Sequence, residues 1–304
     1  MVQSKNNDRD DLGSVENLDN LRKNIDNIDD KILELLASRS RIVDMMGKIK
    51  TTINSKSKNS IIRPGREASM IRRITNKNCG AFSKAAIAQL WRLIIASSIM
   101  IEENTRVAAL SPQQNTECFW LAREYFGSFT PIAKHSSTAD VLNDVVKGNA
   151  TVGVIPIWDD NSPMPWWVRL TEVENAPRVF AKLPFIKQAP SQKSPLVAFG
   201  YINPEPTGDD QSLWGIKSDE KIPFELIEPG LKESFGSDVE VIDHFRQIGE
   251  KTKRCYLLQI ADFVDIEDKR MEKFVKSIKS RAGKDTEFDT FYVGAYATPI
   301  VLLS

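Results

Sequence analysis

Histidine and cysteine are scarce in this chain of 304 residues. It has two histidines, His135 and His244, and three widely separated cysteines, Cys79, Cys118 and Cys255. Two histidines cannot build a multi-histidine metal site, and three scattered cysteines fit neither a disulfide framework nor a zinc cluster. We therefore expect a cytoplasmic protein without a metal or other cofactor.

Long apolar runs and an excess of one charge are also missing. No run approaches the roughly 18 apolar residues of a membrane span, and the polar first 13 residues lack the apolar core of a secretory signal. The 41 basic and 41 acidic side chains cancel, which argues against a generic polyanion-binding protein. We expect neither nucleic acid nor a membrane as a partner.

The charges are unevenly distributed along the chain. Residues 14–103 contain 16 Lys and Arg against 10 Asp and Glu, whereas residues 104–304 contain 23 against 28. A basic first third followed by an acidic remainder suggests two units with different partners.

Apolar residues between positions 18 and 53 recur in steps of three and four, with no proline between them. This heptad pattern predicts one helix of about 50 Å, which is too long for a compact domain to bury alone. The pattern therefore favours a partner helix from another chain. Its positions are Leu18, Leu21, Ile25, Ile28, Ile32, Leu35, Ile42, Met46, Ile49 and Ile53.

Arg39 stands where this register calls for an apolar residue. A buried arginine needs an anionic partner, which could be Asp29 or Asp44 of a neighbouring helix. Lys50 follows eleven residues later, which is three helical turns and about 20°, so it shares the face of Arg39. Two long cations on one face point to a common anion.

Two further helices are predicted, from residue 64 to about 76 and from 84 to about 103. Pro64 suits the first turn of the helix that begins at residue 64, and Ser83 can cap the start of the helix that begins at residue 84. The apolar stripe expected on the last helix is Ile87, Leu90, Trp91, Ile94 and Ile101. Together with Arg39 and Lys50, three polar residues on these helices describe a polar pocket inside a helical bundle: Glu67, Ser98 and Glu102.

The pattern over residues 15–103 is carried by five segments in order: Leu18–Asp29, Leu35–Arg39, Gly47–Lys50, Arg63–Ala68 and Trp91–Ser98. It resembles the AroQ-type chorismate mutase. The resemblance implies a three-helix all-α bundle in an intertwined homodimer. It also implies conversion of chorismate to prephenate, without a cofactor, in phenylalanine and tyrosine biosynthesis.

The resemblance also assigns roles. Arg39 would grip a substrate carboxylate, and Lys50 and Glu102 would face the breaking ether oxygen as the catalytic groups. Substrate binding would fall to Arg22, reaching in from the second subunit, to the Arg66 backbone, to Glu67 at the substrate hydroxyl, and to Ser98 at a carboxylate. Arg63 departs from family members that carry a contacting aspartate there.

Glu102 can donate to an ether oxygen only when it is protonated. Burial would raise the pKa of this carboxyl, so turnover should rise as the pH falls.

After residue 105 short apolar strands alternate with helices, which predicts an open α/β sheet. Strands are expected at 106–110, 130–133, 152–157, 178–183, 196–202, 254–262 and 291–297, and helices at 116–126, 138–147 and 267–280.

Two segments of this region, Val107–Pro112 and Gly148–Ile157, resemble a degenerate prephenate dehydratase, and the end of the chain resembles an ACT-like regulatory unit. The family's Thr-Arg-Phe motif is missing around Ser194–Leu196, and Trp158-Asp159-Asp160 replaces its Glu-Asn-Ser. The Glu-Ser-Arg-Pro effector signature is absent as well.

The predicted organisation is multi-domain. It has a disordered tail (1–13), a helical mutase domain (14–104) and an α/β dehydratase-like domain (105–304), with an ACT-like end at 240–304. The favoured function is a monofunctional chorismate mutase. The alternatives are a bifunctional mutase and prephenate dehydratase, and a non-enzymatic dimeric regulator that binds an aromatic metabolite.

Overall fold

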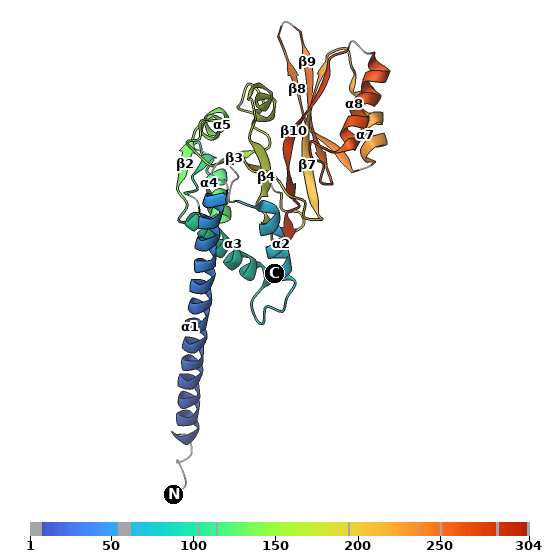
Figure 1. Ribbon diagram of the computed structural model, residues 1–304. Coiled ribbons are helices and arrows are strands. Elements are labelled where there is room, and N and C mark those ends of the chain that lie inside the picture. Colours follow the sequence, from blue (N-terminus) through green and yellow to red (C-terminus); the bar gives the residue numbers. More distant parts are fainter. Residues whose placement is uncertain are drawn as a thin grey trace. The chain divides into compact units, whose positions relative to one another are not determined.

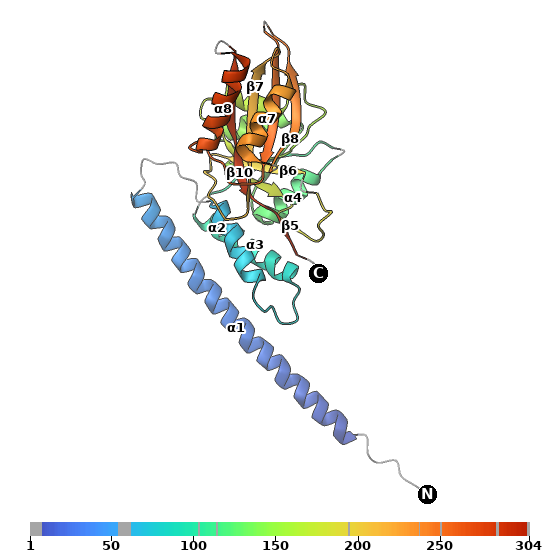
Figure 2. The ribbon, with the colours of Figure 1, turned by 90° about the vertical axis from the view of Figure 1, so that its right-hand side faces the viewer.

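The computed structural model describes residues 8–53, 62–102, 104–113, 115–193, 195–236, 238–249, 251–283 and 286–302. The chain divides into two compact units, residues 1–57 and 58–304. Figures 1 and 2 show the elements of each unit.

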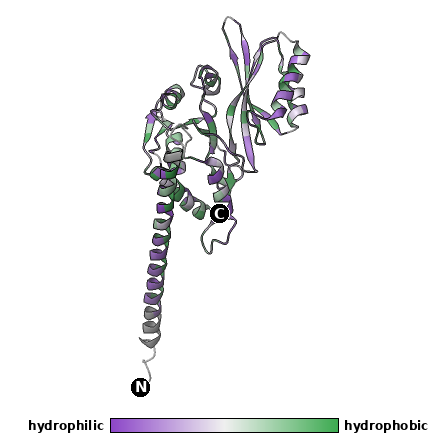
Figure 3. Cartoon of the chain, viewed as in Figure 1, coloured by the Kyte–Doolittle hydropathy of each residue, from purple (hydrophilic) through white to green (hydrophobic). Residues whose placement is uncertain are grey.

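The first unit is one helix, α1 (Asp8–Ile53), of 46 residues. It begins inside the segment expected to be a disordered tail, of which residues 1–7 lie outside the described residues. A length of 46 residues corresponds to roughly 70 Å. Apolar and polar residues are interspersed along it (Figure 3), and the heptad positions Leu21, Ile25 and Ile28 are 52–57% exposed.

The second unit opens with α2 (Pro64–Thr75) and α3 (Lys84–Glu102). Pro64 lies in the first turn of α2, and the Ser83 hydroxyl accepts a hydrogen bond from the Ala86 amide at 3.2 Å, as expected. Both starts therefore follow from local capping chemistry.

The buried face of α3 is not the predicted stripe. Leu90 and Ile101 are 48% and 49% exposed. The stripe prediction was wrong because it assumed one apolar face, whereas α3 buries a neighbouring face against the rest of the second unit. That face consists of Ala88, Arg92, Ile95, Ala96, Ser98 and Ile99. Within the described residues α3 is the one helix long and apolar enough to cross a membrane, a test that core helices also pass.

The α/β region begins as predicted, with a βαβαβ arrangement. The strands β1 (Val107–Leu110), β2 (Ile132–His135) and β3 (Val152–Pro156) are parallel, and their connections are α4 (Glu117–Phe126) and α5 (Thr138–Val146). The sheet continues through antiparallel β6 (Leu196–Gly200) and β4 (Arg178–Leu183). Between β3 and β4 lie α6 (Trp166–Arg169) and the short helix η1 (Leu170–Glu172).

The end of the second unit is a βαββαβ arrangement of ferredoxin-like type. It comprises β7 (Asp210–Asp219), α7 (Phe224–Phe235), β8 (Val239–Gln247), β9 (Lys253–Ile260), α8 (Lys269–Ala282) and β10 (Phe288–Ala297). It starts about thirty residues before the ACT-like end expected at 240–304, and β7, α7 and β8 were not predicted. In Figure 1, α7 and α8 lie on the same side of these strands.

One mixed sheet joins the two parts in the order β2-β1-β3-β6-β4-β10-β7-β9-β8. The join is between Gly294 of β10 and Val179 of β4. Gly294 has φ 150°, and a Cβ there would lie 2.2 Å from the Val179 carbonyl oxygen, so the close approach of the strands requires glycine. The short strands β5 (Ile186–Lys187) and β11 (Ile300–Val301) pair separately.

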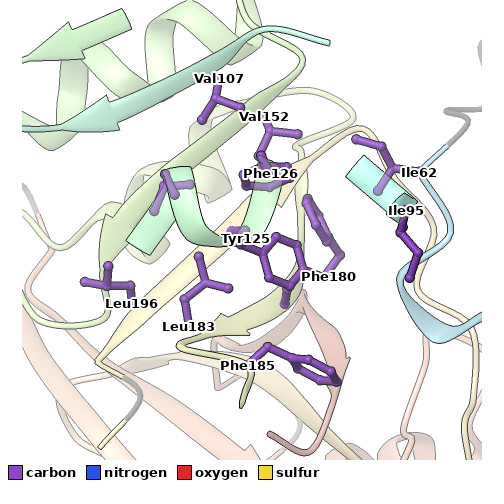
Figure 4. Packing of buried hydrophobic residues seen from close by; sticks show 14 of the residues in the cluster. Ile62, Ile95, Val107, Tyr125, Phe126, Val152, Phe180, Leu183, Phe185 and Leu196 are labelled. Atoms are coloured by element: carbon purple, nitrogen blue, oxygen red, sulfur yellow. The ribbon is translucent and has the colours of Figure 1, made fainter. Parts of the chain in front are cut away.

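The helices α2 and α3 share a hydrophobic core with this sheet. Figure 4 shows Tyr125, Phe126 and Phe180 within that core, with Ile62 and Ile95 to one side. The domain boundary expected at residue 104 is therefore not where the compact units divide. The physical reason is that α2 and α3 bury apolar surface against α4 and the sheet.

Candidate functional site

The seven predicted site residues fall into two sets. Arg22, Arg39 and Lys50 belong to α1 in the first unit, and Arg66, Glu67, Ser98 and Glu102 belong to α2 and α3 in the second. The structure describes each set within its own unit.

On α1, Arg22 is exposed and pairs with Asp19 one turn away at 3.0 Å. Arg39 is half-buried. Lys50 lies in the helix, and its side chain lies outside the described residues. Helical geometry separates Arg39 from Lys50 by about 17 Å along the axis but only about 20° around it. Side chains of their length can therefore reach toward one small ligand between them.

Arg22 has a different relation to Arg39. The two residues are seventeen positions apart on one uninterrupted helix, which places them about 25 Å apart along the axis and roughly 100° apart around it. A small dianion cannot contact both guanidinium groups of the same α1.

Glu67 is the centre of the second set. It lies in the first turn of α2, is 6% exposed, and its Oε2 accepts a hydrogen bond from Arg92 Nη1 at 2.8 Å. Arg92 is itself 3% exposed. A carboxylate this deeply buried is stable as an anion because a guanidinium lies against it.

Arg92 also connects this carboxylate to α4. Its Nε and Nη2 donate to the backbone oxygen of Tyr125 at 3.2 and 2.9 Å, and its Cζ lies 3.8 Å from the centroid of the Tyr125 ring. Glu67 and Tyr125 raise the pKa of Arg92 and outweigh the effect of burial, so the guanidinium stays charged. The site residue Glu67 is thus held rigidly by the α/β part of the unit.

Sequence reasoning did not assign a role to Arg92. A signal was present, because a lone arginine lies between Ala88 and Ile95 at helical spacing in an otherwise apolar helix. A cation at such a position needs a buried acceptor, and Glu67 in the preceding helix is a carboxylate that could provide one.

The remaining residues of this set are placed by α2 and α3. Ser98 is 7% exposed, and its hydroxyl donates to the Ile94 carbonyl at 2.7 Å. Glu102 follows one turn later and is half-buried, at the end of α3. Arg66 is exposed beside Glu67. Ser98 and Glu102 therefore share a helix face, as their spacing predicts.

A cavity of about 590 Å³ lies elsewhere in the second unit, beyond the ends of β1 and β3. Hydroxyl and amide side chains line it, among them Asn115, Ser137 and Thr138, and so does Arg169. The Nε of Arg169 is buried and has no hydrogen-bond partner within the described residues. The carboxyl ends of parallel strands are a common place for ligands in open α/β sheets.

Within the described ranges, no group of three or more His, Cys, Asp and Glu side chains is placed to hold a metal ion. The three cysteines are free thiols.

Residues 21–103 match the family described as chorismate mutase type II. The chain carries a chorismate mutase domain. The matched segment runs through α1, α2 and α3, so the domain spans the division between the two compact units.

Curated relatives match about half of the chain. The bifunctional chorismate mutase/prephenate dehydratase of Stutzerimonas stutzeri is 30% identical over 147 residues, which are 48% of this chain and 40% of the relative. The protein of the same name from Aquifex aeolicus is 33% identical over 147 residues, 47% of this chain and 39% of the relative. The chain thus matches about two fifths of the length of these relatives.

Two solved structures align with about two thirds of the chain at low identity. The quorum quenching acylase GqqA aligns over 64% of this chain and 95% of its own, with 10% identity and a TM-score of 0.46. The prephenate dehydratase of Streptococcus mutans aligns over 64% of this chain and 98% of its own, with 12% identity and a TM-score of 0.43.

Proposed function

We propose that this protein converts chorismate to prephenate as a cytoplasmic homodimer. The observation that carries the proposal is the mutase match over residues 21–103. It includes every predicted site residue, with Arg39 and Lys50 on one face of α1 and Glu67 held buried in α2.

The reaction needs no nucleophile and no proton abstraction, because the rearrangement is pericyclic. The enzyme must hold a flexible dianion in the folded conformer that brings the reacting carbons together. It must also stabilise negative charge that develops on the ether oxygen. A rate gain of about 10⁶ corresponds to roughly 8 kcal/mol, which two charge-assisted donors and conformer selection can supply.

Each residue of the site has a task in this proposal. Arg39 binds a carboxylate with its planar fork, and Lys50 and a protonated Glu102 donate to the ether oxygen. Glu67 accepts from the substrate hydroxyl through Oε1, because Arg92 occupies Oε2. Arg92 is a positioning residue, since it fixes the Glu67 carboxylate without contacting substrate.

Two features support the dimer. Arg22 and Arg39 lie about 25 Å apart on one α1, so one substrate can meet both only if Arg22 comes from a second copy. The exposed apolar positions of α1, such as Ile25 and Ile28, provide the surface on which a second α1 would pack.

The test of the activity is the loss of chorismate absorbance in the ultraviolet, with the product identified as prephenate. We expect turnover by the full chain and none above background in Arg39→Ala. Absence of turnover by the folded wild-type protein would refute the activity and leave the non-enzymatic regulator as the remaining function.

A bifunctional mutase and dehydratase is the second candidate, favoured by the polar cavity at the ends of β1 and β3 and by the names of the curated relatives. The chain lacks the Thr-Arg-Phe motif, so we rank this function below the first. Formation of phenylpyruvate from prephenate, lost in Arg169→Met, would establish it. No phenylpyruvate would leave a monofunctional mutase.

A further inference from the structure

A cavity of about 750 Å³ lies in the second unit, between the ferredoxin-like end and the segment that leads into β4. One wall comes from η1 and the residues up to Arg178. The other comes from α8, from Trp214 of β7 and from Thr290–Tyr292 of β10. This volume is in the range of small-molecule sites. None of the predicted mutase residues lines it.

Arg178 is the charged group of this cavity that lacks a counterion. It is half-buried, and one of its terminal nitrogens donates to the Tyr292 backbone oxygen. Its Cζ lies 5.1 Å from the centroid of the Tyr292 ring. Within the described residues, no carboxylate lies within ion-pair distance of Arg178. Burial lowers its pKa, as expected for a cation without an anionic partner.

The other charged side chains that line the cavity are already paired. Asp268 caps the start of α8 and accepts two hydrogen bonds from Arg270 Nε and Nη2, at 3.1 and 2.7 Å. Glu272 pairs with Lys276 one turn along α8 at 3.3 Å. The unsatisfied charge at the cavity is therefore positive.

Tyr292 contributes a second unsatisfied group. It is 9% exposed, and its hydroxyl is buried without a hydrogen-bond partner in the described part of the chain. A buried hydroxyl without a partner is costly, so an oxygen that enters from the cavity would stabilise this arrangement.

Aromatic and aliphatic side chains form part of the remaining lining, beside the polar Thr171, Asn175 and Thr290. Trp214 packs against Tyr292 with ring centroids 5.3 Å apart, and its indole nitrogen donates to the Val264 carbonyl at 2.9 Å, which fixes its orientation. Phe291, Met271 and Val275 are among the other apolar residues of the lining. A ring-sized apolar group fits such walls.

We propose that this cavity binds a small organic carboxylate with an apolar ring. The carboxylate would pair with the free edge of the Arg178 guanidinium, near the Tyr292 hydroxyl, and the ring would lie against Trp214 and the apolar side chains of α8. The proposal is independent of the mutase activity, because it concerns neither α1 nor α2 nor α3.

The test is a calorimetric titration of the full chain with three probes. 3-Phenylpropanoate has both the ring and the carboxylate, 3-phenylpropan-1-ol has the ring alone, and acetate has the carboxylate alone. We expect saturable binding of 3-phenylpropanoate at millimolar concentration or below. 3-Phenylpropan-1-ol should bind at least about tenfold more weakly because it lacks the charge-assisted pair, and acetate should do so because it buries no ring.

Variants locate the site. Arg178→Met should weaken 3-phenylpropanoate binding about tenfold, and Tyr292→Phe should weaken it a few-fold. Arg254→Met is the matched control, because Arg254 is also half-buried but lines neither this cavity nor the one beyond β1 and β3. It should leave the affinity unchanged. Circular dichroism shows whether each variant folds. If Arg178→Met does not fold, Arg178→Lys replaces it in the test, and we expect that variant to retain part of the binding.

Three results would overturn the proposal: no saturable binding of 3-phenylpropanoate, equal binding of the alcohol, or binding that Arg254→Met abolishes and folded Arg178 variants retain.

Discussion

The two compact units stabilise their site residues in opposite ways. On α1, Arg22 and Arg39 belong to a single helix whose apolar heptad positions include exposed residues, such as Ile25 and Ile28. In the second unit, Glu67 is 6% exposed and is held by Arg92, which is in turn bonded to α4. One half of the proposed site is thus held by contacts within the second unit, and the other half lies on a helix for which we propose a partner helix.

This difference shows what each half contributes. Glu67 is preorganised by a core that includes the α/β sheet, so changes in that core can reach the mutase site through Arg92. In the proposed dimer, the cations of α1 become part of a site when a second copy packs against the exposed apolar positions of α1. The following predictions test this contrast, from the largest expected effect to the smallest.

The largest effect is expected at Arg39. Arg39→Met should lower kcat/KM for chorismate roughly a thousandfold, because a substrate carboxylate loses its charged partner in a desolvated site. Steady-state kinetics measure the loss. Arg41→Met is the matched control, since Arg41 is exposed and donates a hydrogen bond to the Ser38 hydroxyl one turn back. Equal losses of kcat/KM in both variants would show that the total positive charge of α1, rather than the Arg39 guanidinium, determines activity.

The next effect concerns stability. Arg92→Met should lower the free energy of unfolding by about 3 kcal/mol, because it leaves the Glu67 carboxylate buried without a partner. Arg63→Met removes a surface pair with Glu205, whose side chains are 48% and 39% exposed, and should cost below about 1 kcal/mol. Urea titrations compare the two variants. A similar loss of unfolding free energy in both variants would contradict the claim that Arg92 holds the Glu67 carboxylate in place.

The exposed seam predicts an effect on assembly. Ile25→Asp places a charge where a partner α1 would pack and should shift the protein toward monomer in analytical ultracentrifugation. Asn27→Asp adds the same charge at a position outside the seam and should leave the oligomeric state unchanged. A dimer that withstands Ile25→Asp would mean that α1 does not form the interface.

The smallest effect is expected at Glu102. Glu102→Gln keeps a hydrogen-bond donor at the ether oxygen, so its kcat should stay within several-fold of the wild-type value, whereas Glu102→Ala lacks any donor and should be slower than Glu102→Gln. Steady-state kinetics compare the two variants. An Ala variant as active as the Gln variant would remove Glu102 from this role.

The local elements were predictable where capping and periodicity act alone. Pro64 and Ser83 marked the starts of two helices, and the strand at 178–183 was predicted to the residue. Helix α7 was missed because it contains Pro229, and β7 because it contains Gly215. A Cβ at Gly215 would lie 2.0 Å from the Phe291 ring, a long-range reason that the local pattern does not contain.

The site was predictable as far as residue types and helix faces determine it. The family resemblance predicts Arg39, Lys50 and Glu67 as site residues, which stay predictions, but the role of Arg92 depends on a backbone oxygen thirty-three residues away, at Tyr125. The shared core of α2, α3 and the sheet was missed for the same reason. Helical periodicity shows that a face is buried, but it does not show which element covers it.

The central claim is that one mutase site takes Arg39 from one copy and Arg22 from another. The most direct measurement mixes inactive Arg22→Ala with inactive Arg39→Ala under conditions of confirmed subunit exchange. Mixed dimers would contain one intact site, so the mixture should recover about a quarter of wild-type chorismate mutase activity. No recovery after complete exchange would contradict the shared site.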